Sequence, residues 1–255
     1  MLPFTERSLF EEVRQNICSG SSFVVHGPYQ SGKTSLLMAL HAELERKPDE
    51  AAVVYFDISD LRIASDTQDE VAVMDALSRF WSFRVFGEKL SWEDLMAKLQ
   101  KLPRSPRHYV LVDEFQSVFS ISILSSAARK FFRDLSSETA VSHVAVGIFK
   151  VKELPLDDGT MEPPFNKAVF AGMPPFDLRE MGRLFDLYKV HCDPAGISQQ
   201  IQDIIMHESG DHPASFMVLL KLVLQHQIDE NNWTRLLQEN IDFYLTGPKQ
   251  SSERI

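Results

Sequence analysis

Residues 22–37 read SFVVHGPYQSGKTSLL, and they are the most informative part of the sequence about its fold. Its first five residues, 22–26, form a short apolar run that stops at Gly27-Pro28, a pattern typical of a buried strand. Residues 35–46 are rich in Leu, Ala, Met and Glu, which favours a helix. The stretch therefore predicts a strand, a glycine-containing loop of the pattern G-x-x-x-x-G-K-[ST], and a helix in direct succession.

Each residue type in this loop suits a bound nucleoside triphosphate. Glycines let the backbone curl so that its N–H groups face phosphate oxygens, and the following helix adds the positive end of its dipole. Lys33 is expected to reach the β- and γ-phosphates, and the Thr34 hydroxyl to hold Mg²⁺. ATP with Mg²⁺ is therefore the expected ligand. The predicted nucleotide-binding residues of the loop are Gly27, Tyr29, Gln30, Ser31, Gly32, Lys33, Thr34 and Ser35.

A later apolar strand, residues 107–112 (RHYVLV), runs directly into two acidic residues. Asp113, at the carboxyl end of that strand, is expected to hold Mg²⁺ directly or through a water, as a Walker B aspartate does. Glu114 faces a different direction, where a general base could polarise the attacking water. Solvated acids are common at strand ends, so the assignment depends on the phosphate loop earlier in the chain. Glu114 and Lys33 are the predicted catalytic residues.

The rest of residues 1–174 alternates between helical and strand patterns. Such alternation predicts a parallel sheet with helices on both faces, that is, an α/β fold. The further strands are expected at 51–58, 141–149 and 168–171, and the further helices at 7–18, 69–86, 92–102 and 126–135.

The pattern changes after Pro174-Pro175, where four helical segments follow one another. We expect a P-loop NTPase core over residues 1–174, a helical lid subdomain over 175–246, and a flexible polar tail over 247–255. The helices of the lid are expected at 178–190, 196–208, 214–227 and 233–245.

Composition excludes several classes of protein. The net charge of −10 and a pI of about 5.3 do not support binding of nucleic acid through its phosphates, which needs a basic surface. An apolar run long enough for a membrane span is absent, and so is an apolar signal core. Cys18 and Cys192 have no zinc-site spacing. The sequence favours an intracellular soluble protein, cytoplasmic or nuclear. Its expected ligand is a nucleotide, and its partner could be a second copy of the chain or another protein.

The two motifs together resemble the additional-strand P-loop ATPases, which include the AAA+ and the signal-transduction (STAND) ATPases. The resemblance implies a five-stranded sheet in the order 5-1-4-3-2. Residues 4–7 (FTER) are similar to the F-x-x-R-E entry segment of this class, and residues 209–213 (SGDHP) to its G-x-P element. These similarities imply that Arg7 and Pro213 contact the base or ribose.

A narrower resemblance is to the ATPase module of Crinkler-type proteins of fungi and oomycetes. It rests on the segments HGPYQSGKTSLL, VGIFKV and PFNKAVFAGMPPFDLREMGRLF. Some of those proteins carry a nuclease domain after the ATPase, and none is expected within this sequence.

The sequence departs from the ATPase pattern at two positions. Ile148 stands where a polar sensor is usual at the end of the fourth strand, with Lys150 slightly beyond it, and Pro213 stands where an AAA+ protein often has a sensor arginine. Three functions remain open: an ATPase, a slowly hydrolysing nucleotide switch or protein-interaction module, and a P-loop kinase-like transferase. In the third, Asp57 and Asp60 would bind an acceptor.

Overall fold

The computed structural model describes the chain in segments, which form two compact units: Pro3–Met173, and Pro174–Ile255 together with Met1–Leu2. The assignment of these parts as NTPase core, lid and tail stays a prediction. The described residues are 8–28, 31–63, 69–103, 105–119, 122–138, 141–148, 168–175, 177, 179–183, 185–186, 199–209, 215–216 and 219–220.

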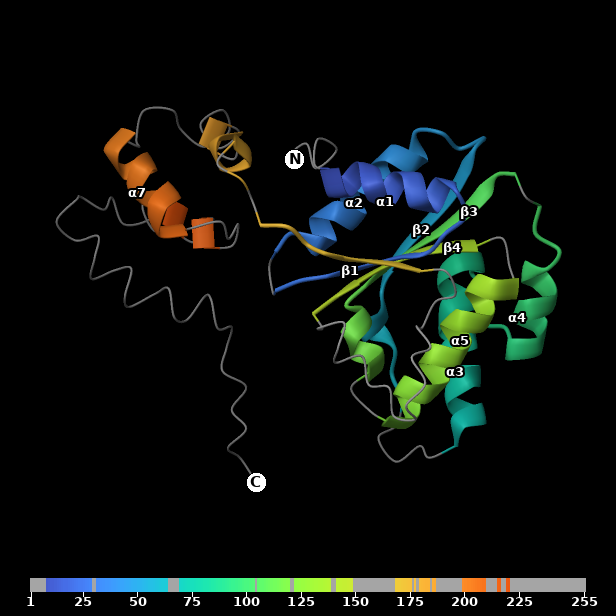
Figure 1. Ribbon diagram of the computed structural model, residues 1–255. Coiled ribbons are helices and arrows are strands. Elements are labelled where there is room, and N and C mark those ends of the chain that lie inside the picture. Colours follow the sequence, from blue (N-terminus) through green and yellow to red (C-terminus); the bar gives the residue numbers. More distant parts are fainter. Residues whose placement is uncertain are drawn as a thin grey trace, which may run out of the picture. The chain divides into compact units, whose positions relative to one another are not determined.

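A five-stranded parallel sheet forms the centre of the first unit (Figure 1). Its order is β2-β3-β4-β1-β5, which confirms the predicted order 5-1-4-3-2 read from the other edge. The strands β3 and β4 lie between β2 and β1. The strand before the phosphate loop, β1, and the strand that ends in Asp113, β3, are therefore separated by β4 alone. The strands are β1 Phe23–His26, β2 Ala51–Asp57, β3 Arg107–Asp113, β4 Val141–Gly147 and β5 Val169–Gly172.

Helices cover both faces of this sheet. The helices α1 (Ser8–Cys18) and α2 (Lys33–Glu45) lie over one face, and α3 (Glu70–Phe86), α4 (Trp92–Leu99) and α5 (Ser122–Glu138) lie on the other side (Figure 1). This arrangement explains the nearly continuous apolar character of the central strands, since a sheet covered on both faces has no solvent-exposed side.

The largest buried side chains lie between the sheet and α3 and α5. Trp81 from α3 and Phe131 and Phe132 from α5 are at most 1% exposed and pack near the rings of Phe115 and His143. Burial of several aromatic side chains, each worth roughly 1.5–3 kcal/mol of transfer free energy, anchors β3 and β4 against these helices. This packing fixes the positions of the carboxyl ends of β3 and β4.

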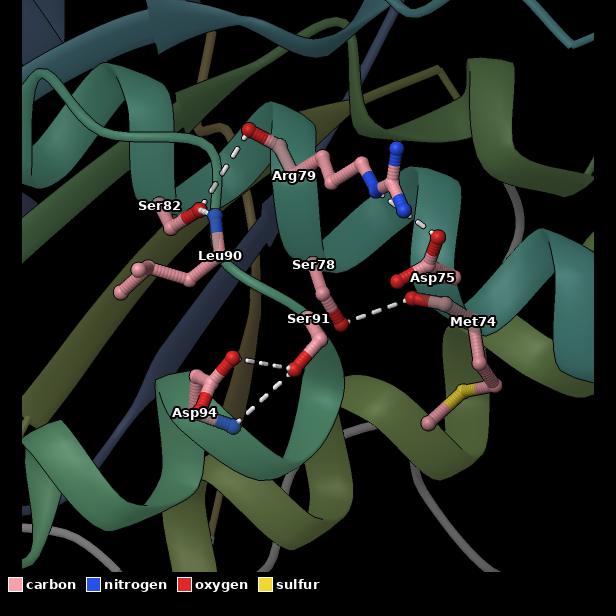
Figure 2. A network of polar contacts seen from close by, with 8 residues as sticks. All are labelled: Met74, Asp75, Ser78, Arg79, Ser82, Leu90, Ser91 and Asp94. Atoms are coloured by element: carbon pink, nitrogen blue, oxygen red, sulfur yellow. Dashed lines mark hydrogen bonds and ion pairs between the residues drawn. The ribbon is translucent and has the colours of Figure 1, made fainter.

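Polar contacts fix the turn between α3 and α4 (Figure 2). The helix α3 ends where Gly87 adopts a left-handed conformation, with φ 74°, and donates its N–H to Phe83 O. The Ser82 hydroxyl then accepts the N–H of Leu90 at 2.9 Å. The helix α4 begins with Ser91 as its N-cap, whose Oγ accepts the N–H of Asp94 at 3.2 Å. These bonds hold α4 close to α3.

The element boundaries differ from the sequence-based predictions by a few residues. The helix α2 begins at Lys33 and not at residue 35, because Gly32 is its N-cap. The strand β3 extends through Asp113, whereas β4 ends at Gly147, before the predicted residue 149. The helix α5 is longer than the predicted 126–135 at both ends, and α4 ends at Leu99, before the predicted residue 102. Boundaries are set by capping contacts that apolar periodicity does not reveal.

The second unit is mostly helical over its described residues. The helix α7 (Gln199–Ser209) matches the expected segment 196–208, and residues 179–183, 185–186, 215–216 and 219–220 are also helical. The rings of Phe185 and Phe216 contact each other edge to face at 4.6 Å between centroids. The predicted helix 233–245 and the tail 247–255 lie outside the described residues.

Candidate nucleotide-binding site

The phosphate loop joins the end of β1 to the start of α2, as the sequence predicts. Gly32 closes it in the left-handed conformation, with φ 94° and ψ 13°, which non-glycine residues rarely adopt. Helix α2 then starts at once, with Leu36 N–H bonded to Gly32 O at 3.0 Å. The first N–H groups of a helix lack intrahelical acceptors, so the start of α2 is suited to binding an anion.

Gly27 is required for a different reason, which is space. Its N–H donates to Gly147 O at 3.3 Å, so the start of the loop is attached to the end of β4. A Cβ at Gly27 would lie 2.7 Å from Met173 Cβ and 3.1 Å from Ser31 Oγ. The first residue of the loop therefore fits between β4 and the segment after β5 only without a side chain.

The Lys33 side chain is folded back into the loop. It is 7% exposed, and its Nζ donates to Pro28 O at 2.5 Å and to Gly27 O at 3.1 Å. Burial lowers the pKa of Lys33, while the carboxylates of Glu114 and Asp113 act in the opposite direction. The ammonium thus lies in a partly desolvated position where the fields of both strand-end acids reach it.

Asp113 presents a buried carboxylate, 4% exposed, with two donors already in place. Tyr55 Oη donates to its Oδ2 at 3.1 Å, and the N–H of Glu114 donates to its Oδ1 at 2.9 Å. Burial raises the pKa of Tyr55, and the neighbouring Asp113 raises it further, so the phenol remains a neutral donor. The two bonds fix the orientation of the carboxylate.

The chain turns away from the direction of β3 at Glu114, the first residue after that strand. The Glu114 backbone is left-handed, with φ 52°, and among the residues that the structure describes it is the one non-glycine residue with a positive φ. Gln116 Nε2 donates to Glu114 Oε2, and Gln116 Oε1 accepts the N–H of Ile148 at 3.0 Å. Strained backbone of this kind occurs at functional sites, where surrounding contacts hold it in place.

Magnesium fits the groups present. Mg²⁺ is usually bound by one or two protein ligands together with phosphates and waters. Thr34, which is exposed at the start of α2, and the Asp113 carboxylate are oxygen ligands of the required kind. Among the residues that the structure describes, no cluster of three or more His, Cys, Asp or Glu side chains forms a cage for a metal. Any Mg²⁺ here would depend on nucleotide phosphates for its remaining ligands.

The other predicted residues divide into two groups. Ser31 is buried in the loop, with Oγ 3.5 Å from Lys33 Nζ, and Ser35 is exposed in the first turn of α2. Ile148, at the position of the usual sensor, is 40% exposed. The remaining residues assigned from the sequence lie outside the described residues: Arg7, Tyr29, Gln30, Lys150 and Pro213.

Sequence reasoning missed two residues that contact the acidic pair, Tyr55 and Gln116. Tyr55 lies on β2, two positions before the strand end, and is opposite Leu111 of β3 in the sheet register. Nothing in the sequence marks it, because a tyrosine in an apolar strand is commonplace. Gln116 did carry a signal: it has a long polar side chain in a segment that also contains Phe115, Val118 and Phe119, and it stands two positions after Glu114.

Comparison with known proteins gives a likeness in structure only. No protein-family model and no curated protein sequence matches this chain. The ORC1 protein of Aeropyrum pernix, solved in complex with DNA, matches with a TM-score of 0.59 at 15% identity, covering 94% of this chain and 66% of that one. AMPPCP-bound DnaA from Aquifex aeolicus matches with a TM-score of 0.54 at 12% identity, covering 92% and 63%.

A third match is the Walker-type ATPase PABY2304 of Pyrococcus abyssi, with a TM-score of 0.58 at 15% identity, covering 93% of this chain and 72% of that one. This chain spans slightly less than two thirds of the ORC1 and DnaA chains. At identities this low the likeness shows the fold alone: a five-stranded parallel α/β sheet flanked by helices. In the described part of the chain, no helix is both long and apolar enough to span a membrane.

Proposed function

We propose that this chain binds ATP with Mg²⁺ and hydrolyses it. The observation that carries the proposal is the position of Lys33, buried in the loop within the fields of Glu114 and Asp113. A lysine, a Mg²⁺-binding carboxylate and a candidate base are the groups that phosphoryl transfer to water requires. They come from α2 and the end of β3, elements far apart in the sequence.

The protein groups have separate tasks in this proposal. The Lys33 ammonium gives up its hydrogen bonds to the carbonyls of Gly27 and Pro28 and donates to oxygens of the β- and γ-phosphates instead. These charge-assisted bonds offset the desolvation of the buried ammonium. Thr34 and Asp113 would hold Mg²⁺, which would supply positive charge against the negative charge that develops on the phosphates. Glu114 orients the attacking water and takes its proton. Arg7 and Pro213 remain proposed contacts for the base or ribose.

The similar structures support a nucleotide ligand without identifying the partner. One of them is a Walker-type ATPase, and another holds AMPPCP. The ORC1 structure contains DNA, but the net charge of −10 here does not favour phosphate contacts by this chain. We therefore propose a protein partner or a second copy of the chain, in a soluble intracellular setting. Membership of the STAND group, or of the Crinkler-type ATPases, remains part of the proposal and rests on the sequence segments alone.

A second candidate function is a nucleotide switch that hydrolyses ATP slowly. The observation in its favour is Ile148, whose apolar and partly exposed side chain occupies the usual position of a polar sensor. Without a side chain there to detect the γ-phosphate, turnover would be slow while binding is retained. The kinase-like alternative is weaker, because Asp60 pairs with Arg84 at 2.5 Å and Asp57 Oδ1 accepts the N–H of Ser59.

Turnover of the wild-type chain compared with Glu114→Gln separates these candidates. For an ATPase we expect Mg²⁺-dependent phosphate release that falls about 100-fold or more in the variant, while ATP affinity is kept. Slow turnover that is equal in both chains would support the switch. Failure of the wild type to bind ATP, GTP or ADP, with or without Mg²⁺, would reject both. ADP formation only with an added small-molecule acceptor would support the transferase.

A further inference from the structure

Gln116 makes two hydrogen bonds of opposite kind through one side-chain amide. It lies in the 3₁₀ turn Phe115–Phe119 that follows β3. Its Nε2 donates to the Glu114 carboxylate, and its Oε1 accepts the backbone N–H of Ile148 at 3.0 Å. Both polar ends of the amide are therefore engaged, which fixes the plane and direction of the side chain.

These two bonds connect the ends of two neighbouring strands. Glu114 directly follows β3, and Ile148 directly follows β4. The residue before Ile148, Gly147, accepts the N–H of Gly27, which is the first residue of the phosphate loop. A continuous chain of contacts thus runs from the Glu114 carboxylate through Gln116 and the end of β4 to the loop.

The surroundings of Gln116 indicate what its two hydrogen bonds do. Glu114 is held at a φ of 52°, a conformation that costs energy in a residue other than glycine. Like the Asp113 carboxylate, the Glu114 carboxylate interacts electrostatically with the Lys33 ammonium of the phosphate loop and favours its charged form. The side chain of Ile148 cannot form a polar contact, but its backbone N–H can, and Gln116 uses that group.

We propose that Gln116 is the positioning residue of this site: it holds the Glu114 carboxylate toward the phosphate loop and couples it to the end of β4. The coupling passes through the backbone at Ile148, at the position where a polar sensor side chain is absent. This inference rests on the proposed ATPase function. It extends that function by naming a residue that acts through Glu114 without contacting the nucleotide.

The first test is a comparison of kcat with ATP affinity. Gln116→Met keeps the length and volume of the side chain but removes both hydrogen bonds. We expect kcat to fall about 10-fold or more, because a misplaced base is costly, while ATP affinity changes less than about twofold. Gln116→Glu should be at least as damaging, since it places a second carboxylate against that of Glu114. Gln100→Ala, at an exposed glutamine after α4, is the matched control and should leave kcat unchanged.

The second test is a double-mutant cycle with Glu114→Gln. If Gln116 acts through the Glu114 carboxylate, Gln116→Met should cause little further loss of kcat once that carboxylate is gone. A residue that only stabilised the fold would lower kcat equally in both backgrounds, and would also lower the melting temperature and ATP affinity. That additive result would overturn the inference.

The outcomes separate the inference from the function on which it rests. Glu114-dependent turnover in the wild type, together with unchanged kcat in Gln116→Met, would overturn the role of Gln116 alone. A wild-type chain that does not turn over ATP, or whose turnover ignores Glu114→Gln, would overturn the proposed ATPase function and this inference with it.

Discussion

Tyr55 and Asp113 lie on neighbouring strands, and the Tyr55 hydroxyl donates a hydrogen bond of 3.1 Å to Asp113 Oδ2. A second donor, the N–H of Glu114, holds the other carboxylate oxygen at 2.9 Å. Each carboxylate oxygen has a further lone pair that can bind a metal, so the carboxylate is oriented without being fully occupied. Hydrogen bonds that orient a metal-binding carboxylate in this way also tune its affinity for the metal.

Tyr55→Phe should weaken binding of Mg·ATP and leave metal-free ADP binding unchanged. Loss of one hydrogen bond to the buried carboxylate should reduce the affinity for Mg·ATP by about 0.5–1.5 kcal/mol, or roughly 2- to 12-fold. Titration calorimetry with and without Mg²⁺ would measure this difference. Tyr109→Phe is the matched control: it lies near the opposite end of β3, where its hydroxyl is 3.9 Å from Cys18 Sγ. Equal effects of the two substitutions would contradict the role of Tyr55.

Lys33→Ala should reduce the affinity for ATP by about 1.5–3 kcal/mol, which is roughly 10- to 150-fold, because a charge-assisted hydrogen bond to the phosphates is lost. The same substitution removes the donor that now satisfies the carbonyls of Gly27 and Pro28. Filter binding or calorimetry with ATP would measure the loss, and Lys101→Ala, at an exposed position, provides the control. Unchanged ATP affinity in Lys33→Ala would disprove the assignment of the loop.

Gly27→Ala should distort the loop, since its Cβ would lie 2.7 Å from Met173 Cβ. Overpacking of this kind costs about 1–3 kcal/mol of the free energy of unfolding and should also weaken ATP binding. Gly172→Ala is the control, because its Cβ meets only the His26 ring at 3.6 Å, an ordinary contact. Thermal unfolding and ATP titration would measure both effects.

A second substitution at Met173 should rescue Gly27→Ala. Met173→Ala would keep the clashing Cβ, whereas Met173→Gly removes it. The double variant Gly27→Ala with Met173→Gly should therefore regain ATP affinity relative to Gly27→Ala. No recovery in the double variant would mean that Met173 Cβ is not the contact that excludes a side chain at Gly27, and would leave the contact with Ser31 Oγ at 3.1 Å as the cause.

The sequence predicted the architecture well because its two motifs constrain the fold strongly. One strand runs into a G-x-x-x-x-G-K-[ST] loop, and a second strand ends in Asp113. These two motifs place the carboxyl ends of two of the five strands at the site. The order of the sheet was implied by family resemblance and is confirmed. Local periodicity alone could not have given it, because the period of a strand shows which face is buried and not which strand is its neighbour.

The contacts around the acidic pair could not be predicted, because they join residues distant in sequence. Tyr55 reaches Asp113 only through the pairing of β2 with β3, and Gln116 reaches Ile148 only because β3 and β4 are adjacent. The prediction that Ile148 leaves the site without a polar sensor considered side chains alone. Its backbone N–H, which no sequence pattern reports, provides the polar contact.

His143 should make the free energy of unfolding depend on pH. It is fully buried on β4, near the rings of Trp81 and Phe132, and burial lowers its pKa to about 3. The unfolded chain binds this proton below about pH 6.5, whereas the folded chain does not until about pH 3. Between those values the unfolded state holds more protons, so stability is full above the upper limit and falls as the pH drops.

The difference should be measurable by urea unfolding. From about pH 7 to about pH 5, His143 alone should lower the free energy of unfolding by about 2 kcal/mol. His143→Phe keeps an aromatic ring between Trp81 and Phe132 but cannot titrate, so its stability should fall by that much less over the same interval. His26 and His108, whose pKa values burial also lowers, remain in both chains and cancel in the comparison. His207→Gln, at an exposed histidine, should behave as the wild type. An equal fall in the wild type and His143→Phe would mean that His143 is protonated as readily in the folded chain as in the unfolded one.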